Sequence, residues 1–280
     1  MSRNALHAAQ AMAQTTRVSG QRMTADQADG LRRLFAGCAQ RFVPLVANPH
    51  VAFASVVLER VTACLTLAGA TVLLVDAAET SPVAPDMSWL DLAACIERLD
   101  ERTFYLAARG MPRTQVDARG SARRWLDVLG QSAPQADVVL VHGEATDLAR
   151  VFQRSLARPM LIASDQPEAV KHAYAAAKLL ARRAALATFD VLLCAPSGSR
   201  HARPIIDTMA ACAEDFFGSV MHDWAAIDPA SDIGDAPGTA LCRVMREQMQ
   251  IEDSASPVQQ ALPASPTNTT AVPAWHATTP

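Results

Sequence analysis

The sequence is short of several features that would narrow its function at once. Its 280 residues contain six widely scattered cysteines and no C-x-x-C pair, which argues against a disulfide or zinc framework and favours reduced thiols. No run of about 18 apolar residues exists, so no segment is expected to cross a membrane. The net charge of −3 gives no basic field that would point to nucleic acid. The N-terminus lacks the apolar run of a secretory signal, and a cytoplasmic protein is expected.

Patterns typical of catalytic and metal sites are also missing. The seven histidines show no metal-ligand spacing, and His142, His172 and His222 are interpreted as structural. Ser197 has no G-x-S-x-G turn around it, which argues against a hydrolase nucleophile. We therefore predict no catalytic residue and no metal ligand.

What the chain does have is a regular alternation of apolar and helical segments, with 50% of its residues hydrophobic. This pattern predicts a doubly wound α/β fold, in which helices cover both faces of a mostly parallel sheet. Strands are expected at 41–47, 71–76, 102–109, 136–143, 158–164, 189–196 and 218–224. Helices are expected at about 53–68, 88–98, 119–130, 167–187 and 202–216, with another between the fourth and fifth strands.

Pro44 conflicts with this pattern, because a proline inside a central strand removes a ladder hydrogen bond. The first strand is therefore expected to start after Pro44 or to carry a bulge there. The whole chain divides into five segments by composition. These are a mobile leader (1–22), an N-terminal helix (23–39), the α/β domain (40–230), an amphipathic C-terminal region (231–252) and a disordered Pro/Ser/Thr-rich tail (253–280).

The C-terminal region contains the helical segment "TALCRVMREQMQI", which has one apolar face. That face is a candidate for peripheral membrane contact, but the segment is short and lacks aromatic residues, so binding would be weak. Packing on the domain or on a partner is the alternative. The residues of this face are Leu241, Val244, Met245 and Met249.

Strand 71–76 and its surroundings resemble the MinD/ParA group of deviant P-loop ATPases. At that group's spacing, its phosphate-binding turn G-K-G-G-V-G-K-T falls on "NPHVAFAS", residues 48–55. Only Ser55, at the position of the magnesium-binding hydroxyl, matches. Pro49 and Ala54 stand in place of the two lysines, and no glycine is present.

Further departures from the group's pattern point the same way. Asp76 matches the first acid of its D-x-D, while Ala78 replaces the second, His142 replaces a strand-end acid, and Cys194 replaces an adenine-contacting asparagine. Phosphoryl transfer depends on the missing lysine and metal ligands. We therefore predict a pseudo-ATPase with no ATP or Mg²⁺ cofactor, in which Ser55 and Asp76 are relics of a nucleotide site; weak nucleotide binding stays open.

The N-terminal helix carries a second resemblance. Its "DQADGLRRL" is similar to the D-Q-A-x-x-L-R motif that precedes the MinD-like domain of the FlhG (FleN) family, regulators of flagellar number and placement. In that family the motif forms a helix that docks on the SRP-type GTPase FlhF and stimulates its GTP hydrolysis. The resemblance carries this partner-binding role to Asp26, Gln27, Ala28, Leu31 and Arg32.

The resemblance implies a non-hydrolysing regulator of flagellar biosynthesis that binds FlhF, with basal-body components as candidate further partners. It also implies a position at the inner face of the cell membrane or at the cell pole. Two alternatives stay open: a MinD/ParA-type ATPase with a divergent but usable site, and a MinD-like accessory factor of another envelope machine, such as cellulose secretion. The oligomeric state is not predicted.

Overall fold

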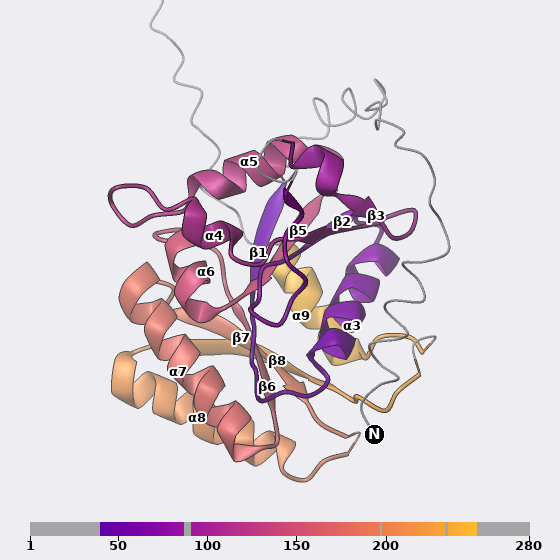
Figure 1. The fold of residues 1–280 in the computed structure, drawn as a ribbon. Helices are drawn as coiled ribbons and strands as arrows, with labels where there is room; N and C mark the ends of the chain where they lie inside the picture. Colours follow the sequence, from indigo (N-terminus) through magenta and orange to yellow (C-terminus); the bar gives the residue numbers. More distant parts are fainter. Residues whose placement is uncertain (1–39, 87–90, 197, 233–234, 251–280) are drawn as a thin grey trace, which may run out of the picture.

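Eight strands form one sheet in the computed structural model of this chain, which describes residues 40–86, 91–196, 198–232 and 235–250 (Figure 1). The strand order is β3-β4-β2-β5-β1-β6-β7-β8, and β3 alone is antiparallel to its neighbour. The mostly parallel sheet predicted from the sequence is therefore confirmed. The strands are β1 (Arg41–Val46), β2 (Val72–Asp76), β3 (Glu97–Arg98), β4 (Thr103–Ala107), β5 (Val138–Gly143), β6 (Met160–Ser164), β7 (Thr188–Cys194) and β8 (Val220–Ile227).

The two faces of the sheet are covered unequally. α3 and α9 lie side by side on one face, and α4 to α8 cover the other (Figure 1). Both faces are thus shielded from water, which is why β5 is buried at every position and apolar along most of its length. The helices are α3 (Ala54–Leu67), α4 (Met111–Thr114), α5 (Arg124–Ser132), α6 (Ala145–Val151), α7 (Pro167–Ala184), α8 (Ala202–Phe217) and α9 (Thr239–Met249).

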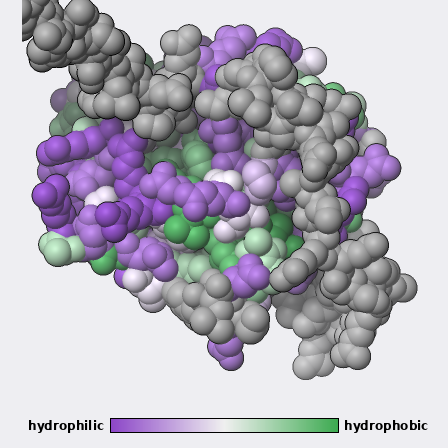
Figure 2. All heavy atoms as spheres, turned by 90° about the horizontal axis from the view of Figure 1, so that it is seen from above, coloured by the Kyte–Doolittle hydropathy of each residue, from purple (hydrophilic) through white to green (hydrophobic). Residues whose placement is uncertain are grey.

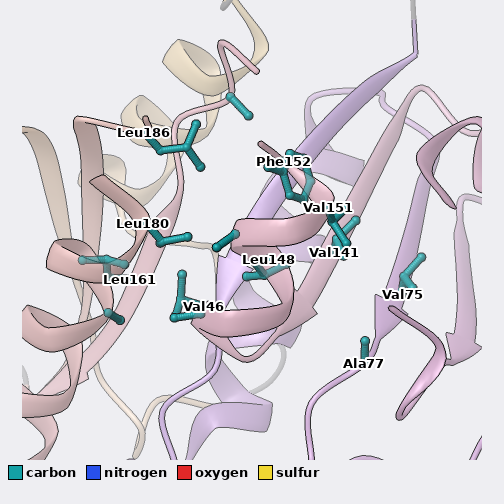
Figure 3. Packing of buried hydrophobic residues seen from close by; sticks show 14 of the residues in the cluster. Val46, Val75, Ala77, Val141, Leu148, Val151, Phe152, Leu161, Leu180 and Leu186 are labelled. Atoms are coloured by element: carbon teal, nitrogen blue, oxygen red, sulfur yellow. The ribbon is translucent and has the colours of Figure 1, made fainter. Parts of the chain in front are cut away.

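Each face has its own apolar cluster. In the larger one, Leu148 and Phe152 of the α6 region pack over Val46 of β1 and Val141 of β5 (Figure 3). The smaller cluster is formed by the sheet with α3 and α9. The outer surface is mostly hydrophilic in the view of Figure 2, with apolar residues visible in its middle. In the part of the chain that the structure describes, no helix is both long and apolar enough to cross a membrane.

The prediction of a helix at 88–98 is wrong for the residues of this range that the structure describes. Residues 93–95 form a single 3-10 turn, η2 (Ala93–Cys95), and the chain then extends into β3. The reason is the turn that follows. The Asp100 carboxylate accepts hydrogen bonds from the backbone N–H groups of Arg102 and Thr103, both at 2.8 Å, and this turn joins β3 to β4 as a hairpin.

The helix expected at 119–130 begins later, at Arg124, and the short α4 before it was not predicted. Gly120 explains the delay, because its φ of +80° is left-handed and cannot continue into a helix.

Both expectations for Pro44 are wrong, since β1 runs through it without a bulge and pairs it with Val141. The N–H groups of Arg41 and Ala47 point to β5, so alternation points the ring nitrogen of Pro44 to the β6 side. Pairing with β6 begins only at Leu45. The missing N–H therefore removes no ladder hydrogen bond.

Candidate functional site

The carboxyl ends of the parallel strands are where ligands bind in doubly wound folds. In this chain that edge includes the turn from β1 to α3, the end of β2 at Asp76 and the end of β5 at His142 and Gly143. These are the positions at which the sequence predicted a relic nucleotide site. Their hydrogen bonds decide what the edge can hold.

The turn after β1 is pinned by the side chain of Asn48, which is 4% exposed. Its Nδ2 donates to the carbonyl oxygens of Ile162 in β6 (2.8 Å) and Ala169 in α7 (2.9 Å). Its Oδ1 accepts from the backbone N–H of His50 at 3.1 Å. The asparagine thus ties the turn to β6 and to α7.

Residues 49–51 of the same turn offer no free backbone donor to an anion. A phosphate-binding turn directs several consecutive N–H groups at its ligand. Here Pro49 has no N–H, the N–H of His50 is bonded to Asn48 Oδ1, and that of Val51 donates to the Asn48 carbonyl at 3.1 Å. The N–H groups of His50 and Val51 are therefore satisfied inside the protein.

Ser55 is an exposed residue in the first turn of α3. Residue 54, where the phosphate lysine would stand, is a half-buried alanine that packs against the smaller apolar cluster. The side chains that hydrogen-bond to Asp76 are those of Ser81, Tyr105 and His142.

Asp76 is instead the centre of a polar cluster formed with Ser81, Tyr105 and His142. Its Oδ1 accepts from His142 Nδ1 at 2.7 Å and from the Ser81 hydroxyl. Its Oδ2 accepts from the Tyr105 hydroxyl at 3.4 Å. Asp76 and His142 are register partners on the adjacent strands β2 and β5, so the sheet itself brings them together.

The electrostatics of this cluster keep Asp76 ionised. Burial raises the pKa of Asp76, but the hydrogen bond and charge of His142, helped by Ser81, outweigh it, so the pKa lies below its ordinary value. Burial and the Asp76 charge raise the pKa of Tyr105, which therefore stays a neutral donor. Both oxygens of the carboxylate thus have protein donors.

The side chain of His142 is buried instead of being exposed at the edge of the sheet. Its side chain is 6% exposed, and its Nε2 is buried without a hydrogen-bond partner. A ligand that approached Oδ1 of Asp76 would compete with this imidazole. The arrangement places a basic side chain of the protein where the resemblance to P-loop ATPases implies an acid.

A second carboxylate on this edge is also bound by side chains of the protein. Asp147, in the first turn of α6, has a 3% exposed side chain and binds Arg113 Nε at 3.0 Å. Arg113 also reaches Glu79, in the segment after β2, with Nη2 2.7 Å from Oε1. This ion-pair chain links the segments that follow β2, β4 and β5.

The sequence did not predict the roles of Asn48, Ser81, Tyr105 and Asp147. Asn48 carried one signal, because Asn-Pro is a turn dipeptide. Tyr105 and Asp147 pair with residues 29 and 34 positions away, whereas Ser81 binds Asp76 only five positions before it.

The structure places the predicted apolar face of α9 on the domain. Leu241, Val244 and Met245 are at most 2% exposed and belong to the smaller cluster, and Met249 packs against it half-buried. In this arrangement the face is not available to a bilayer. The predicted partner-binding residues Asp26, Gln27, Ala28, Leu31 and Arg32 lie outside the described residues, as do the leader and the tail.

No protein-family model matches this sequence, and no curated protein does. Solved structures do match. The MinC–MinD cell division complex of Aquifex aeolicus matches with a TM-score of 0.51 at 11% identity, over 75% of this chain and 95% of that one. A Cyanothece McdA–ATP complex matches with 0.51 at 12% identity, over 76% and 97%.

The cobyrinic acid a,c-diamide synthase of Mycobacterium smegmatis, solved with ADP and magnesium, also matches, with a TM-score of 0.51 at 16% identity, over 74% of this chain and 93% of that one. Identities this low establish the fold and nothing finer. The chain has the fold of the MinD/ParA-type P-loop NTPases.

Proposed function

We propose that this protein is a non-hydrolysing regulator built on a MinD-type sheet, and that it acts by contact with a partner protein. The observation that supports a non-hydrolysing protein is the Asp76 cluster, in which His142 binds the carboxylate at 2.7 Å. Together with the pinned turn at Asn48, it occupies polar groups at the strand edge where doubly wound folds bind ligands. Two structures with this fold, McdA and the diamide synthase, are nucleotide complexes.

The partner is proposed from the sequence. The segment "DQADGLRRL" resembles the FlhF-activating motif of FlhG proteins, and it precedes a domain with the expected fold. We therefore propose FlhF as the partner and the control of flagellar number or placement as the process. In this proposal Leu31 anchors the helix, Gln27 orients the attacking water, and Arg32 contributes to docking or to charge stabilisation.

The test is GTP hydrolysis by the FlhF of the same organism, with and without the full-length protein. Stimulation is expected; about a thousandfold is known for arginine fingers, and a smaller effect still supports the proposal. A peptide of residues 22–38 should stimulate as well, because activation needs only a few groups placed at the phosphates.

Three variants sharpen the assay. Gln27→Ala should remove most of the stimulation, and Leu31→Ala should weaken binding by about 1–3 kcal/mol as a lost anchor. Ser55→Ala is the matched control and should stimulate like the parent protein, because the sheet serves as a scaffold. An unchanged GTPase rate with both the full-length protein and the peptide would contradict the proposal.

A further inference from the structure

α9 is held against α3 by polar and apolar contacts, and we call this junction the α3–α9 seam, formed by Arg60, Cys64, Leu241, Cys242 and Val244. Leu241 and Val244 supply buried apolar surface. Arg60, 4% exposed, donates to three groups in the segment that leads into α9. These are the Asp235 carbonyl at 2.7 Å, the Ser231 hydroxyl at 2.9 Å and the Asp232 carbonyl.

Two thiols face each other across this seam. The Sγ atoms of Cys64 in α3 and Cys242 in α9 are 2.9 Å apart, and both cysteines are free. A disulfide bond is about 2.05 Å long, so the sulfurs need to approach by only about 1 Å. Among the cysteines that the structure describes, this is the pair in hydrogen-bond contact.

The two thiols differ in access. Cys64 is 4% exposed, whereas Cys242 is partly exposed and its Sγ lies 3.8 Å from the Pro237 carbonyl. Burial raises the pKa of Cys64 to about 12, and its contact with Cys242 adds to this. Because thiolates are the nucleophiles, an oxidant should meet Cys242 first.

We propose that Cys64 and Cys242 form a redox-modifiable pair that a small disulfide oxidant, such as oxidised glutathione, converts into a covalent α3–α9 link. The Cys242 thiolate attacks one glutathione sulfur, the glutathione S–S bond breaks, and a glutathione thiolate leaves and takes up a proton. Cys64, on losing its proton, then attacks the Cys242 sulfur of this mixed disulfide. A second glutathione leaves and is protonated, so the two protein thiols are oxidised and one glutathione disulfide is reduced to two thiols.

The link would fix α9 to the domain. The two cysteines are 178 positions apart, so the bond closes a long loop and restricts the unfolded chain strongly. It would turn the packed position of α9, which now depends on side-chain contacts, into a covalent one. This inference does not depend on the nucleotide site or on FlhF.

The test treats the full-length protein with oxidised glutathione, blocks the remaining thiols and analyses its peptides by mass spectrometry without reduction. We expect one linked peptide pair containing Cys64 and Cys242, with the loss of two hydrogens. The melting temperature should rise by roughly 5–10 °C and return after reduction.

Two variants separate the steps. Cys64→Ser should stop the reaction at glutathione bound to Cys242, and Cys242→Ser should give neither the link nor the rise in melting temperature. Cys212→Ser, a partly exposed cysteine in α8, is the matched control and should still form the link. The proposal fails if the parent protein keeps glutathione on Cys242 without closing the bond, if other cysteines pair, or if neither cysteine reacts.

Discussion

Two carboxylates, the partly buried Asp76 and the fully buried Asp190, lie near opposite ends of the parallel strands and have different partners. Asp76, at the end of β2, is bound by His142 from the neighbouring strand. Asp190, near the start of β7, is fully buried and binds Arg158 Nε of the segment before β6 and Gln248 Nε2 of α9, both at 2.8 Å. One carboxylate is neutralised within the sheet, and the other joins the sheet to its last helix.

The pKa values of the two groups move in opposite directions. Burial raises the pKa of Asp76, but His142 outweighs it and leaves the pKa low. At Asp190 burial dominates, and the pKa stays above its ordinary value although Arg158, Gln248 and His222 lower it. At the predicted ligand edge a histidine of the neighbouring strand holds the carboxylate in its charged form, whereas at the opposite end burial outweighs the effect of the partners.

The largest effect is expected from Asp190→Ala. The change leaves the Arg158 guanidinium buried without its partner and removes the side-chain bond from Gln248 to the sheet, so the free energy of unfolding should fall by about 3–5 kcal/mol. Urea denaturation measures it. The control is Asp207→Ala, which breaks an exposed pair with Arg203 and should cost no more than about 0.5 kcal/mol. Equal losses of unfolding free energy in the two variants would contradict a stabilising role for the buried contacts of Asp190.

Leu241→Glu tests whether α9 belongs to the domain. Because Leu241 is 2% exposed, a buried charge should cost at least the about 2–5 kcal/mol of a Leu→Ala change, and the melting temperature should fall. The matched control is Arg246→Glu on the exposed side of the same helix. A parent protein that sediments with liposomes, together with an unchanged melting temperature for Leu241→Glu, would instead favour a membrane-binding helix.

A smaller effect is expected from Asp76→Asn, about 1–3 kcal/mol at pH 7, because the charged hydrogen bond to His142 is lost. The pKa of Asp76 is depressed in the folded state, so its contribution is present above the ordinary value of 3.8 and is lost as the pH falls through the lower folded value. Melting curves recorded from neutral pH downward should therefore show a shallower acid loss in the variant. Parallel curves would mean that the pair contributes nothing.

The contribution of Asp190 to stability has the opposite pH dependence. Its raised folded pKa means that ionisation costs stability as the pH rises through that value, so Asp190 contributes nothing to the acid loss.

The smallest effect is expected from Ser55→Ala, which should change the free energy of unfolding by no more than about 0.5 kcal/mol because the residue is exposed. Asn48→Ala, in the turn just before the same helix, should cost about 1–3 kcal/mol, since Ile162 and Ala169 lose a buried donor. Thermal melts of the two variants make the comparison. A larger cost at Ser55 than at Asn48 would show that the turn is not held as described.

The sequence predicted the sheet well because the central parallel strands are buried on both faces and leave nearly continuous apolar runs, as β2, β5 and β6 do. It failed at 88–98, where the local turn at Asp100 decided the structure. It also failed at Pro44, because the lateral position of a strand relative to its neighbours cannot be read from the chain.

The sequence predicted the candidate site only by the absence of the glycines, lysines and acids that a nucleotide site needs. The resemblance to the MinD/ParA group located Ser55 and Asp76, but the contacts found in place of a ligand are mostly pairings between distant segments. The 2.7 Å bond between Asp76 and His142 follows from the order of β2 and β5 in the sheet, and the bonds of Asn48 follow from the position of β6. Such pairings become visible only when the topology is known.

The decisive experiment is a calorimetric titration of the full-length protein with ATP and magnesium. Because Asn48 pins the turn and His142 binds Asp76, we expect no binding tighter than about millimolar, where binding free energies are only about −4 kcal/mol. Micromolar binding that Asp76→Ala or Ser55→Ala abolishes would show a working nucleotide site and contradict the loss of ATP binding.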